Sequence, residues 1–321
     1  MKRAFLGLLA CFVLVFGEQN ATQQSKQNSA QKNEQSTTTQ GEQNSASTSE
    51  SEQNLSISKG QVLILEFNKQ GLEGIKSQKS TPKGAQKTPK KEQFFTHPDN
   101  ENKVILIFGS AYKNPVKNAQ ILVHYKDGKS LKYDLLGDEG EYKKELLQVA
   151  QSKVTPPKEV LERIRKELNE ANAVYATYTD KALFEGKFIL PLQSVITSDY
   201  GTARVFNGTL MSYHSGTDFR AAVGTPVVAA NDGIVRIAKD RYYAGGSVVI
   251  DHGYKIFSQY YHLSQVKVKV GQKVKKGELI ALSGDTGRVT GAHLHFGIFA
   301  GGTQVDPLDF IEKFNALFDD E

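Results

Sequence analysis

The first part of the chain combines one apolar run with a long polar one. Residues Ala4 to Gly17 are almost all apolar and follow the basic Met1-Lys2-Arg3. A basic start, a short apolar run and a small residue at its end are the layout of a secretory signal peptide, so we predict a leader at 1–17. Residues 18–56 are mostly Gln, Asn, Ser, Thr, Glu and Lys, which bury too little apolar surface to offset their ordering entropy. We predict a disordered polar linker there.

Short apolar runs separated by turn residues characterise residues 57–150. The runs Gln61–Phe67, Lys103–Phe108 and Gln120–Tyr125 are rich in β-branched residues, and Asp127-Gly128 suits a hairpin turn. This pattern predicts a small N-terminal β domain of the immunoglobulin-like type.

The periodicity becomes helical in residues 151–185. Apolar residues recur there at helical spacing, at Val160, Leu161, Ile164 and Leu168. Pro156-Pro157 suits a helix start, so we predict a connecting helix that ends near Tyr175. Short strands with Gly-rich turns return in residues 186–321, which close with a predicted helix from Asp306 to Phe318. The whole chain is therefore predicted to be mainly β.

Composition limits the classes of protein that remain. With 321 residues, 39% of them hydrophobic, the chain has room for two globular domains. Outside the leader no apolar run is long enough to cross a bilayer, so we predict no transmembrane segment. The net charge of +5 weakly favours an anionic polymer such as a cell wall and says nothing specific about nucleic acid, and we predict no nucleic-acid partner. The single cysteine, Cys11, lies in the leader and excludes a disulfide; alternatively, Leu8-Leu9-Ala10-Cys11 is a lipid-attachment motif that anchors the protein through Cys11.

Candidate chemistry comes from histidines. In a strand, His293 and His295 of Gly291–Gly297 share one face, and upstream motifs supply His214, Asp218 and His262. A catalytic zinc site keeps three protein ligands and one open position, which two histidines and one carboxylate provide. Three of His214, Asp218, His293 and His295 can bind metal while the fourth acts on the bound water, and His262 can stabilise an oxyanion. The residues alone leave open which of His293 and His295 is the ligand.

The order and flanks of these motifs resemble one known family. The motifs are His214-Ser215-Gly216-Thr217-Asp218, Gly224-Thr225-Pro226-Val227, Asp251-His252-Gly253, Tyr260-Tyr261-His262-Leu263, Gly291-Ala292-His293-Leu294-His295-Phe296 and Asp306-Pro307. In this combination the region from Phe188 to Phe310 resembles the lysostaphin/LytM-type peptidoglycan zinc metalloendopeptidases. The order of the predicted domains resembles, more loosely, a bacterial subgroup with an immunoglobulin-like domain ahead of the catalytic one.

The resemblance implies a fold, a cofactor and roles. The implied fold for 186–321 is an open antiparallel β-sandwich with a groove, and the implied zinc ligands are His214, Asp218 and His295. His293 is then the general base and His262 stabilises the substrate carbonyl, whereas His252 has a structural role. The implied substrate is the peptide cross-link of peptidoglycan, with the D-Ala to meso-diaminopimelate bond expected for an exported, periplasmic protein.

Other functions remain open at this stage. The same fold also occurs as a non-catalytic LytM-like module that activates a wall amidase, and a carboxypeptidase acting on stem peptides is a further alternative. Val270–Ala281 is similar to the repeat of biotinyl or lipoyl carriers, but no lysine beside a methionine follows it in a hairpin turn. The N-terminal domain either restrains the active site or positions substrate. The sequence identifies neither a regulatory partner nor an oligomeric state.

Overall fold

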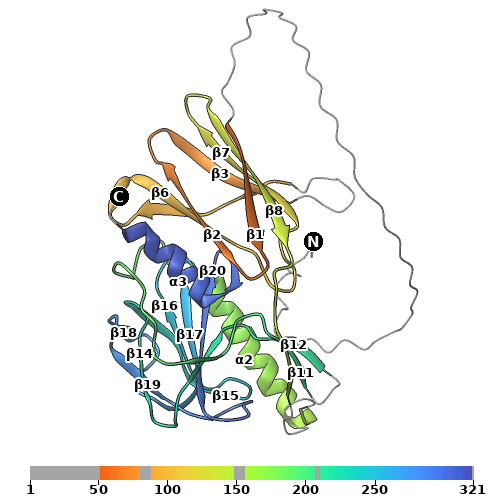
Figure 1. Ribbon diagram of the computed structural model, residues 1–321. Coiled ribbons are helices and arrows are strands. Elements are labelled where there is room, and N and C mark those ends of the chain that lie inside the picture. Colours follow the sequence, from red (N-terminus) through yellow and green to blue (C-terminus); the bar gives the residue numbers. More distant parts are fainter. Residues whose placement is uncertain (1–50, 80–87, 148–155, 207–209, 320–321) are drawn as a thin grey trace, which may run out of the picture.

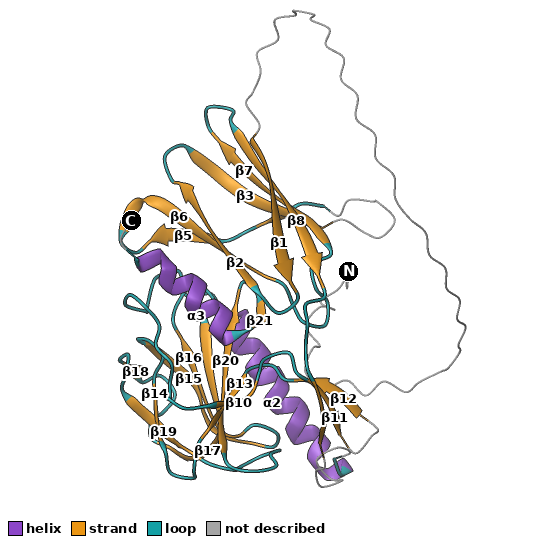
Figure 2. Cartoon of the chain, viewed as in Figure 1, coloured by secondary structure: helices purple, strands orange, loops and turns teal. Residues whose placement is uncertain are grey.

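The computed structural model describes residues 51–79, 88–147, 156–206 and 210–319. The predicted leader, the lipid-attachment motif around Cys11 and most of the predicted polar linker lie outside these residues. Within them the chain is mainly β, with open sheets, as predicted (Figures 1 and 2). No helix in the described part of the chain has the length and apolar character needed to cross a membrane.

The N-terminal domain is built from two sheets that face each other. One sheet has the order β1 (Ser51–Ser58), β8 (Ser130–Asp138), β7 (Asn118–Tyr125), β3 (Leu72–Lys79) and β4 (Lys90–Lys91). The other has the order β2 (Val62–Asn68), β6 (Asn100–Gly109) and β5 (Phe94–His97). Alternate residues such as Ile75, Leu106 and Ile121 point between the sheets and form their core. The immunoglobulin-like assignment of this sandwich remains a prediction.

Strand β1 begins at Ser51, ahead of the predicted start at Ile57. Its first residues are polar and carry no hydrophobic alternation, so the sequence pattern gives no strand signal there. The strand pairs in parallel with β8, from Ser51 opposite Leu131 to Ser58 opposite Asp138, and this pairing provides its backbone hydrogen bonds.

The C-terminal domain is organised around one large sheet. Its main path comprises β10 (Ile196–Ser198), β13 (Thr217–Arg220), β20 (His293–Ala300), β17 (Phe257–Val266), β16 (Gly245–Asp251), β15 (Gly233–Arg241) and β18 (Lys273–Val274). Three further strands join it at the sides: β14 (Pro226–Val228), β19 (Leu279–Ser283) and β21 (Thr303–Val305). One face packs around Tyr260, Phe296 and Phe310, and the other carries the candidate site.

Two helices join the domains. Helix α2 (Lys158–Ala176) ends close to the predicted position and packs Ala171 and Tyr175 against Phe257 and Phe299 of the large sheet. Helix α3 (Pro307–Asn315), followed by the short 3-10 helix η1 (Ala316–Phe318), begins with Asp306 as N-cap, whose carboxylate accepts from the Leu308 amide at 2.9 Å.

Helix α3 lies between the two domains in Figure 2 and is hydrogen-bonded to both of them. Val62 of β2 donates its amide to Asp309 Oδ2 at 2.9 Å, and Lys313 Nζ donates to the Val62 carbonyl at 2.8 Å. Asn315, at the end of the helix, accepts from the Phe188 amide at 2.7 Å. The C-terminal helix therefore fixes the N-terminal domain above the large sheet.

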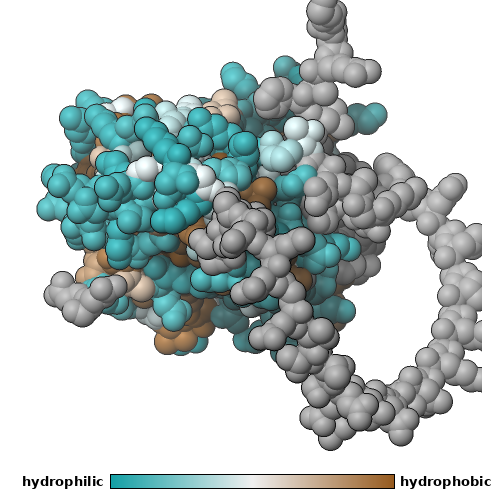
Figure 3. All heavy atoms as spheres, turned by 90° about the horizontal axis from the view of Figure 1, so that it is seen from above, coloured by the Kyte–Doolittle hydropathy of each residue, from teal (hydrophilic) through white to brown (hydrophobic). Residues whose placement is uncertain are grey.

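A small third sheet forms a second junction. It has the order β12 (Leu210–Tyr213), β11 (Ala203–Phe206) and β9 (Lys144–Leu147), and β9 arrives from the N-terminal domain and pairs in parallel with β11. Viewed from above, the described surface is mostly hydrophilic, with a few small apolar patches (Figure 3).

Candidate metal centre and active site

The register of three neighbouring strands brings the predicted site residues together. Asp218 of β13 lies directly opposite His295 of β20, and His295 lies opposite Tyr261 of β17. His214 precedes β13 in the chain and reaches the same point. Gly216, between His214 and Asp218, allows this approach, because a Cβ there would lie 2.6 Å from His295 Nε2.

His214, Asp218 and His295 form a compact buried cluster, which we call the metal cluster. Asp218 Oδ1 lies 2.7 Å from His214 Nε2 and 2.9 Å from His295 Nδ1, and the two ring nitrogens are 2.9 Å apart. All three side chains are buried. Among the described residues, these three side chains form the group whose potential metal-binding atoms all lie within 4.8 Å of one another.

The donor set fits a zinc ion. His214 Nδ1 donates to the Asp199 carbonyl at 3.0 Å, so the neutral ring turns the lone pair of Nε2 toward Asp218 Oδ1. Two electron-rich atoms this close repel each other unless a cation or a proton lies between them. Ligands of a tetrahedral zinc with bonds of ~2.0 Å lie ~3.3 Å apart, so the three atoms, which are 2.7 to 2.9 Å apart here, need to separate by only about 0.5 Å to hold the ion. Two imidazole nitrogens and one carboxylate oxygen are donors that zinc prefers, and they leave one coordination position open.

The cluster has the protonation states that metal binding requires. Burial lowers the pKa of His214, and it lowers the pKa of His295 to about 4, so both rings are neutral near pH 7. Burial by itself would raise the pKa of Asp218, but the neighbouring His214 and His295 hold it well below its usual range. The cluster therefore offers two neutral nitrogens and one carboxylate.

A second layer of contacts, which sequence reasoning missed, holds Asp218. Arg204 of β11 donates from Nη2 to Asp218 Oδ2 at 2.8 Å and to Ser198 Oγ at 3.2 Å. Glu145 of β9 lies 3.5 Å from Arg204 Nε and accepts from Ser198 Oγ at 3.1 Å. No local motif marks Arg204 or Glu145, because their contacts depend on the pairing of β9 with β11.

His293 and His262 lie beside the metal cluster, at longer distances than those that join its three members. Their ring centroids are 4.8 Å apart, and His293 Nε2 lies 3.7 Å from Asp218 Oδ2. His293 Nδ1 donates to the Gly291 carbonyl at 2.8 Å, so its Nε2 carries the lone pair in the neutral ring. The His293 side chain keeps 16% of its surface exposed, in contrast to the buried cluster.

An irregularity in β17 turns His262 into the site. His262 has φ 63° and lies where the pairing of β16 with β17 shifts register. Such a bulge lets consecutive residues point to the same side, so His262 and Tyr261 both reach the candidate site. The left-handed conformation is costly for a histidine and is typical of functional sites. His262 Nδ1 donates to the Thr286 carbonyl at 2.9 Å, and burial, together with His293 and His295, lowers its pKa well below the usual range.

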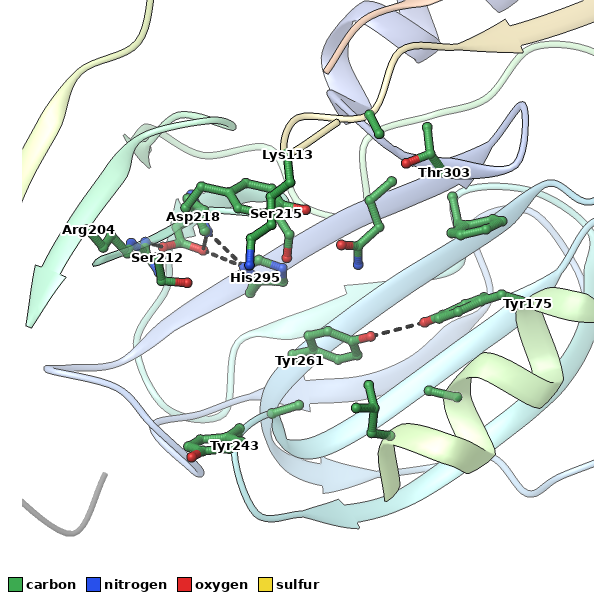
Figure 4. A pocket seen from close by; sticks show the side chains of 18 of the residues that line it. Lys113, Tyr175, Arg204, Ser212, Ser215, Asp218, Tyr243, Tyr261, His295 and Thr303 are labelled. Atoms are coloured by element: carbon green, nitrogen blue, oxygen red, sulfur yellow. Dashed lines mark hydrogen bonds and ion pairs between the residues drawn. The ribbon is translucent and has the colours of Figure 1, made fainter. Parts of the chain in front are cut away.

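The site opens into a groove of about 1300 Å³. Its floor carries Tyr261, which stacks on His295 with ring centroids 5.3 Å apart and whose hydroxyl lies 3.3 Å from that of Tyr175 on α2 (Figure 4). Residues of the N-terminal domain, including Phe108 and Lys113, line the opposite side. The groove is therefore composite, with walls from the large sheet, α2 and the N-terminal domain.

Comparisons with known proteins agree with this geometry. Residues 212–307 match the model of peptidase family M23. The chain is 48% identical over 95 residues to the peptidoglycan DD-endopeptidase ShyA of Vibrio cholerae, covering 30% of this chain and 22% of that protein. It is 41% identical over 106 residues to the glycyl-glycine endopeptidase ALE-1 of Staphylococcus capitis, covering 31% and 29%. The chain thus spans less than a third of the length of these relatives.

A solved structure extends the likeness in fold beyond the matched domain. A peptidase M23 structure from Pseudomonas aeruginosa superposes with a TM-score of 0.58 at 24% identity and covers 80% of this chain and 95% of its own. At this identity the match concerns the fold. The match to the peptidase M23 family model covers His214, Asp218 and His295, so the region that is similar to these peptidases is the one that carries the metal cluster, with a donor set suited to zinc.

Proposed function

We propose that the protein is a zinc-dependent endopeptidase that hydrolyses peptide cross-links of peptidoglycan, at the bond between D-Ala and meso-diaminopimelate. The observation that carries the proposal is the convergence of His214, Asp218 and His295 in one groove with His293 and His262 beside them. The names of the V. cholerae relatives, which are peptidoglycan DD-endopeptidases, support the substrate class. Such a substrate requires export, in agreement with the predicted leader and periplasmic location.

His214, Asp218 and His295 are the proposed zinc ligands. When bound, zinc polarises the scissile carbonyl and lowers the pKa of water, so that hydrolysis becomes possible near neutral pH. Arg204 holds Asp218 by its outer oxygen, which leaves Oδ1 directed at the two histidines.

His293 is the proposed general base. Donation from Nδ1 to the Gly291 carbonyl fixes the ring and leaves Nε2 free to take a proton. Nε2 then returns that proton to the leaving amine. Because the side chain is partly exposed and carries no second hydrogen bond in the described residues, it can hold a proton transiently and release it.

His262 is the proposed stabiliser of the negative charge on the substrate oxygen. Since Nδ1 donates to Thr286, Nε2 can donate to that oxygen only when the ring is protonated. Burial opposes protonation in the free protein. A negative charge that develops next to Nε2 raises the pKa of His262 and favours the donating form when it is needed.

Digestion of purified peptidoglycan tests this function. The zinc-loaded protein should convert cross-linked dimers into monomers with a new free amine on diaminopimelate, detected by mass spectrometry of the fragments. A chelator should abolish the conversion and added zinc should restore it. His295→Ala, purified in the same way, serves as the inactive control.

Other products would indicate the alternative functions. Release of free D-alanine without loss of dimers would identify a carboxypeptidase acting on stem peptides. A protein that holds one zinc per chain, leaves every wall peptide intact and stimulates an added amidase would be a non-catalytic module. Either result would contradict the proposed endopeptidase activity.

A further inference from the structure

The roof of the groove above the metal cluster comes from the loop between β6 and β7. Ser110 anchors the loop: its carbonyl accepts from the Gly60 amide at 2.6 Å and its hydroxyl accepts from the Val116 amide at 3.2 Å. Tyr112 in the same loop stacks on Tyr213 with ring centroids 4.2 Å apart and planes at 8°. Because Tyr213 immediately precedes His214, the loop is fixed directly beside a proposed metal ligand.

Further aromatic contacts hold this junction in place. Tyr112 also packs edge-on against Tyr142, at 5.0 Å, and against Tyr200, at 6.3 Å. The Tyr142 ring lies against Gly201, where a Cβ would lie 2.1 Å from it. Lys59 Nζ sits over the Tyr112 ring at 4.7 Å. A side chain carried by this loop therefore has a defined position relative to the metal cluster.

Lys113 is the side chain that the loop extends toward the cluster. Its Nζ lies 5.8 Å from the centroid of the Tyr213 ring, and the residue lines the groove together with Ser215, Asp218 and His295. Figure 4 shows the Lys113 side chain pointing down from the roof toward His295. The ammonium group thus faces the space above the proposed zinc.

Lys113 differs from Arg204, which also lies beside the cluster, in having no anionic partner among the described residues. Arg204 is paired with Asp218 and Glu145, whereas no carboxylate of the described residues lies within 4.0 Å of Lys113 Nζ. Two like charges at short range repel each other, so an ammonium group next to a divalent cation is unfavourable unless an anion sits between them. A carboxylate of the substrate is an anion of the kind that this place can accept.

We propose that Lys113 binds the carboxylate on the α-carbon of the leaving amine, and thereby selects the bond that is cut. The inference rests on the proposed function, because in a D-Ala to meso-diaminopimelate cross-link the scissile nitrogen is attached to a carbon that bears a free carboxylate. That carboxylate lies two bonds from the scissile nitrogen, within reach of a lysine beside the metal. A charge-assisted hydrogen bond to Lys113 orients the bond over the metal cluster.

The consequence is a substrate preference set by the N-terminal domain. A cross-link whose carboxylate is amidated lacks the charge that Lys113 recognises, and a glycyl-glycine bond lacks the carboxylate altogether. The protein should therefore cleave the free-acid cross-link in preference to both. Lys113 acts here as a specificity residue, supplied from outside the peptidase M23 domain.

Two purified muropeptide dimers, one with the free carboxylate and one with it amidated, test the proposal. With wild type, amidation should raise KM about tenfold or more, the size expected for one charge-assisted hydrogen bond. Lys113→Ala should raise KM on the free acid by a similar factor with little change in kcat, and should not affect the amidated dimer further. Lys113→Arg should restore most of the preference.

Controls separate this proposal from others. Lys117→Ala removes the same charge from the end of the same loop, at a residue that does not line the groove, and should match wild type. Zinc content should be equal in all variants. Equal losses on both dimers, or faster cleavage by Lys113→Ala because the lysine shields the site, would overturn the proposal while leaving the endopeptidase activity intact. Failure of wild type to cleave either dimer would instead contradict the proposed function, and with it the role of Lys113.

Discussion

Two buried clusters on the same large sheet contain histidine next to aspartate, yet they differ in how their polar atoms are satisfied. In the closed cluster, made of Asp232, Asp251, His252 and Ser258, every side-chain polar atom has a hydrogen-bond partner. His252 Nδ1 donates to the Asp232 carbonyl at 2.6 Å, and its Nε2 lies 2.7 Å from Ser258 Oγ. Asp251 accepts from the Gly253 amide and from Arg236.

The metal cluster is arranged differently. His214 and His295 both direct a nitrogen at the same oxygen of Asp218, and His295 Nε2 is buried without a hydrogen-bond partner in the described structure. A network in which every polar atom is hydrogen-bonded stabilises a fold. Metal-ligand atoms that all point at one place instead cost folding free energy until a cation binds between them. Both clusters are buried and both combine histidine with aspartate, so the direction in which the polar atoms point is what marks one as structural and the other as a metal site.

The strongest test of this contrast removes a proposed ligand. Asp218→Ala or His295→Ala should abolish zinc binding and lower wall cleavage by more than about 10⁴-fold, because no other group supplies the same chemistry. Zinc content by atomic absorption and release of monomers from purified walls measure both effects. Full zinc occupancy in His295→Ala would mean that the convergent geometry does not identify the metal site.

The next test separates the two histidines of β20. His293→Ala should keep zinc at wild-type stoichiometry and lose about 10²- to 10⁴-fold in kcat, the range expected for a general base. The reason is geometric, since His293 Nε2 is 3.7 Å from Asp218 Oδ2 whereas His295 Nδ1 is 2.9 Å from Asp218 Oδ1. Equal zinc loss in His293→Ala and His295→Ala would refute this division of roles.

Local patterns predicted the elements but not their long-range partners. Apolar alternation marked the strands of both domains, and the 3.6-residue period marked α2. The start of β1 at Ser51 and the pairing of β9 with β11 were missed, because polar edge residues and pairings over long sequence distances leave no local signal. The pattern of apolar residues along a strand indicates which face of that strand is buried. It does not indicate which other strand lies beside it in the sheet.

The candidate site shows the same limit. Motif spacing was sufficient to nominate His214, Asp218, His295, His293 and His262, and the structure brings all of them into one groove. Arg204 and Lys113 could not be nominated, because each reaches the cluster through tertiary contacts between segments far apart in the sequence. The positive φ of His262 was equally hidden, since a histidine in a strand pattern gives no sign of a bulge.

A third test compares the arginines of the two clusters. Arg204→Ala should weaken zinc affinity about 10- to 100-fold in a chelator competition, as expected when a group that orients a ligand is removed. Arg236→Ala, which breaks the 2.7 Å contact to Asp251 in the closed cluster, is the matched control and should leave zinc affinity unchanged. An equal loss in both variants would show that the effect comes from general destabilisation.

The smallest expected effect on cleavage belongs to His252. His252→Asn should retain zinc and wall cleavage at pH 7.5, and should lose roughly 1–3 kcal/mol of unfolding free energy because it breaks buried hydrogen bonds. Urea unfolding followed by circular dichroism measures the loss. A variant that unfolds normally but no longer binds zinc would show that the closed cluster supports the metal site.

The pH dependence of the same variant gives a sharper test. Burial lowers the pKa of His252 to about 4 in the folded protein, against about 6.5 in the unfolded chain. Between these values the unfolded chain binds more protons at this residue, so the contribution of His252 to the unfolding free energy of wild type should be constant above about pH 7 and fall as the pH drops toward 4. The His252 contribution to this fall is about 3 kcal/mol, and His252→Asn lacks it. The difference in unfolding free energy between wild type and variant should therefore shrink as the pH is lowered from 7.5 to 4.5. A difference that does not depend on pH would mean that the fold does not hold His252 neutral. The closed cluster could then no longer serve as the structural example in the comparison with the metal cluster.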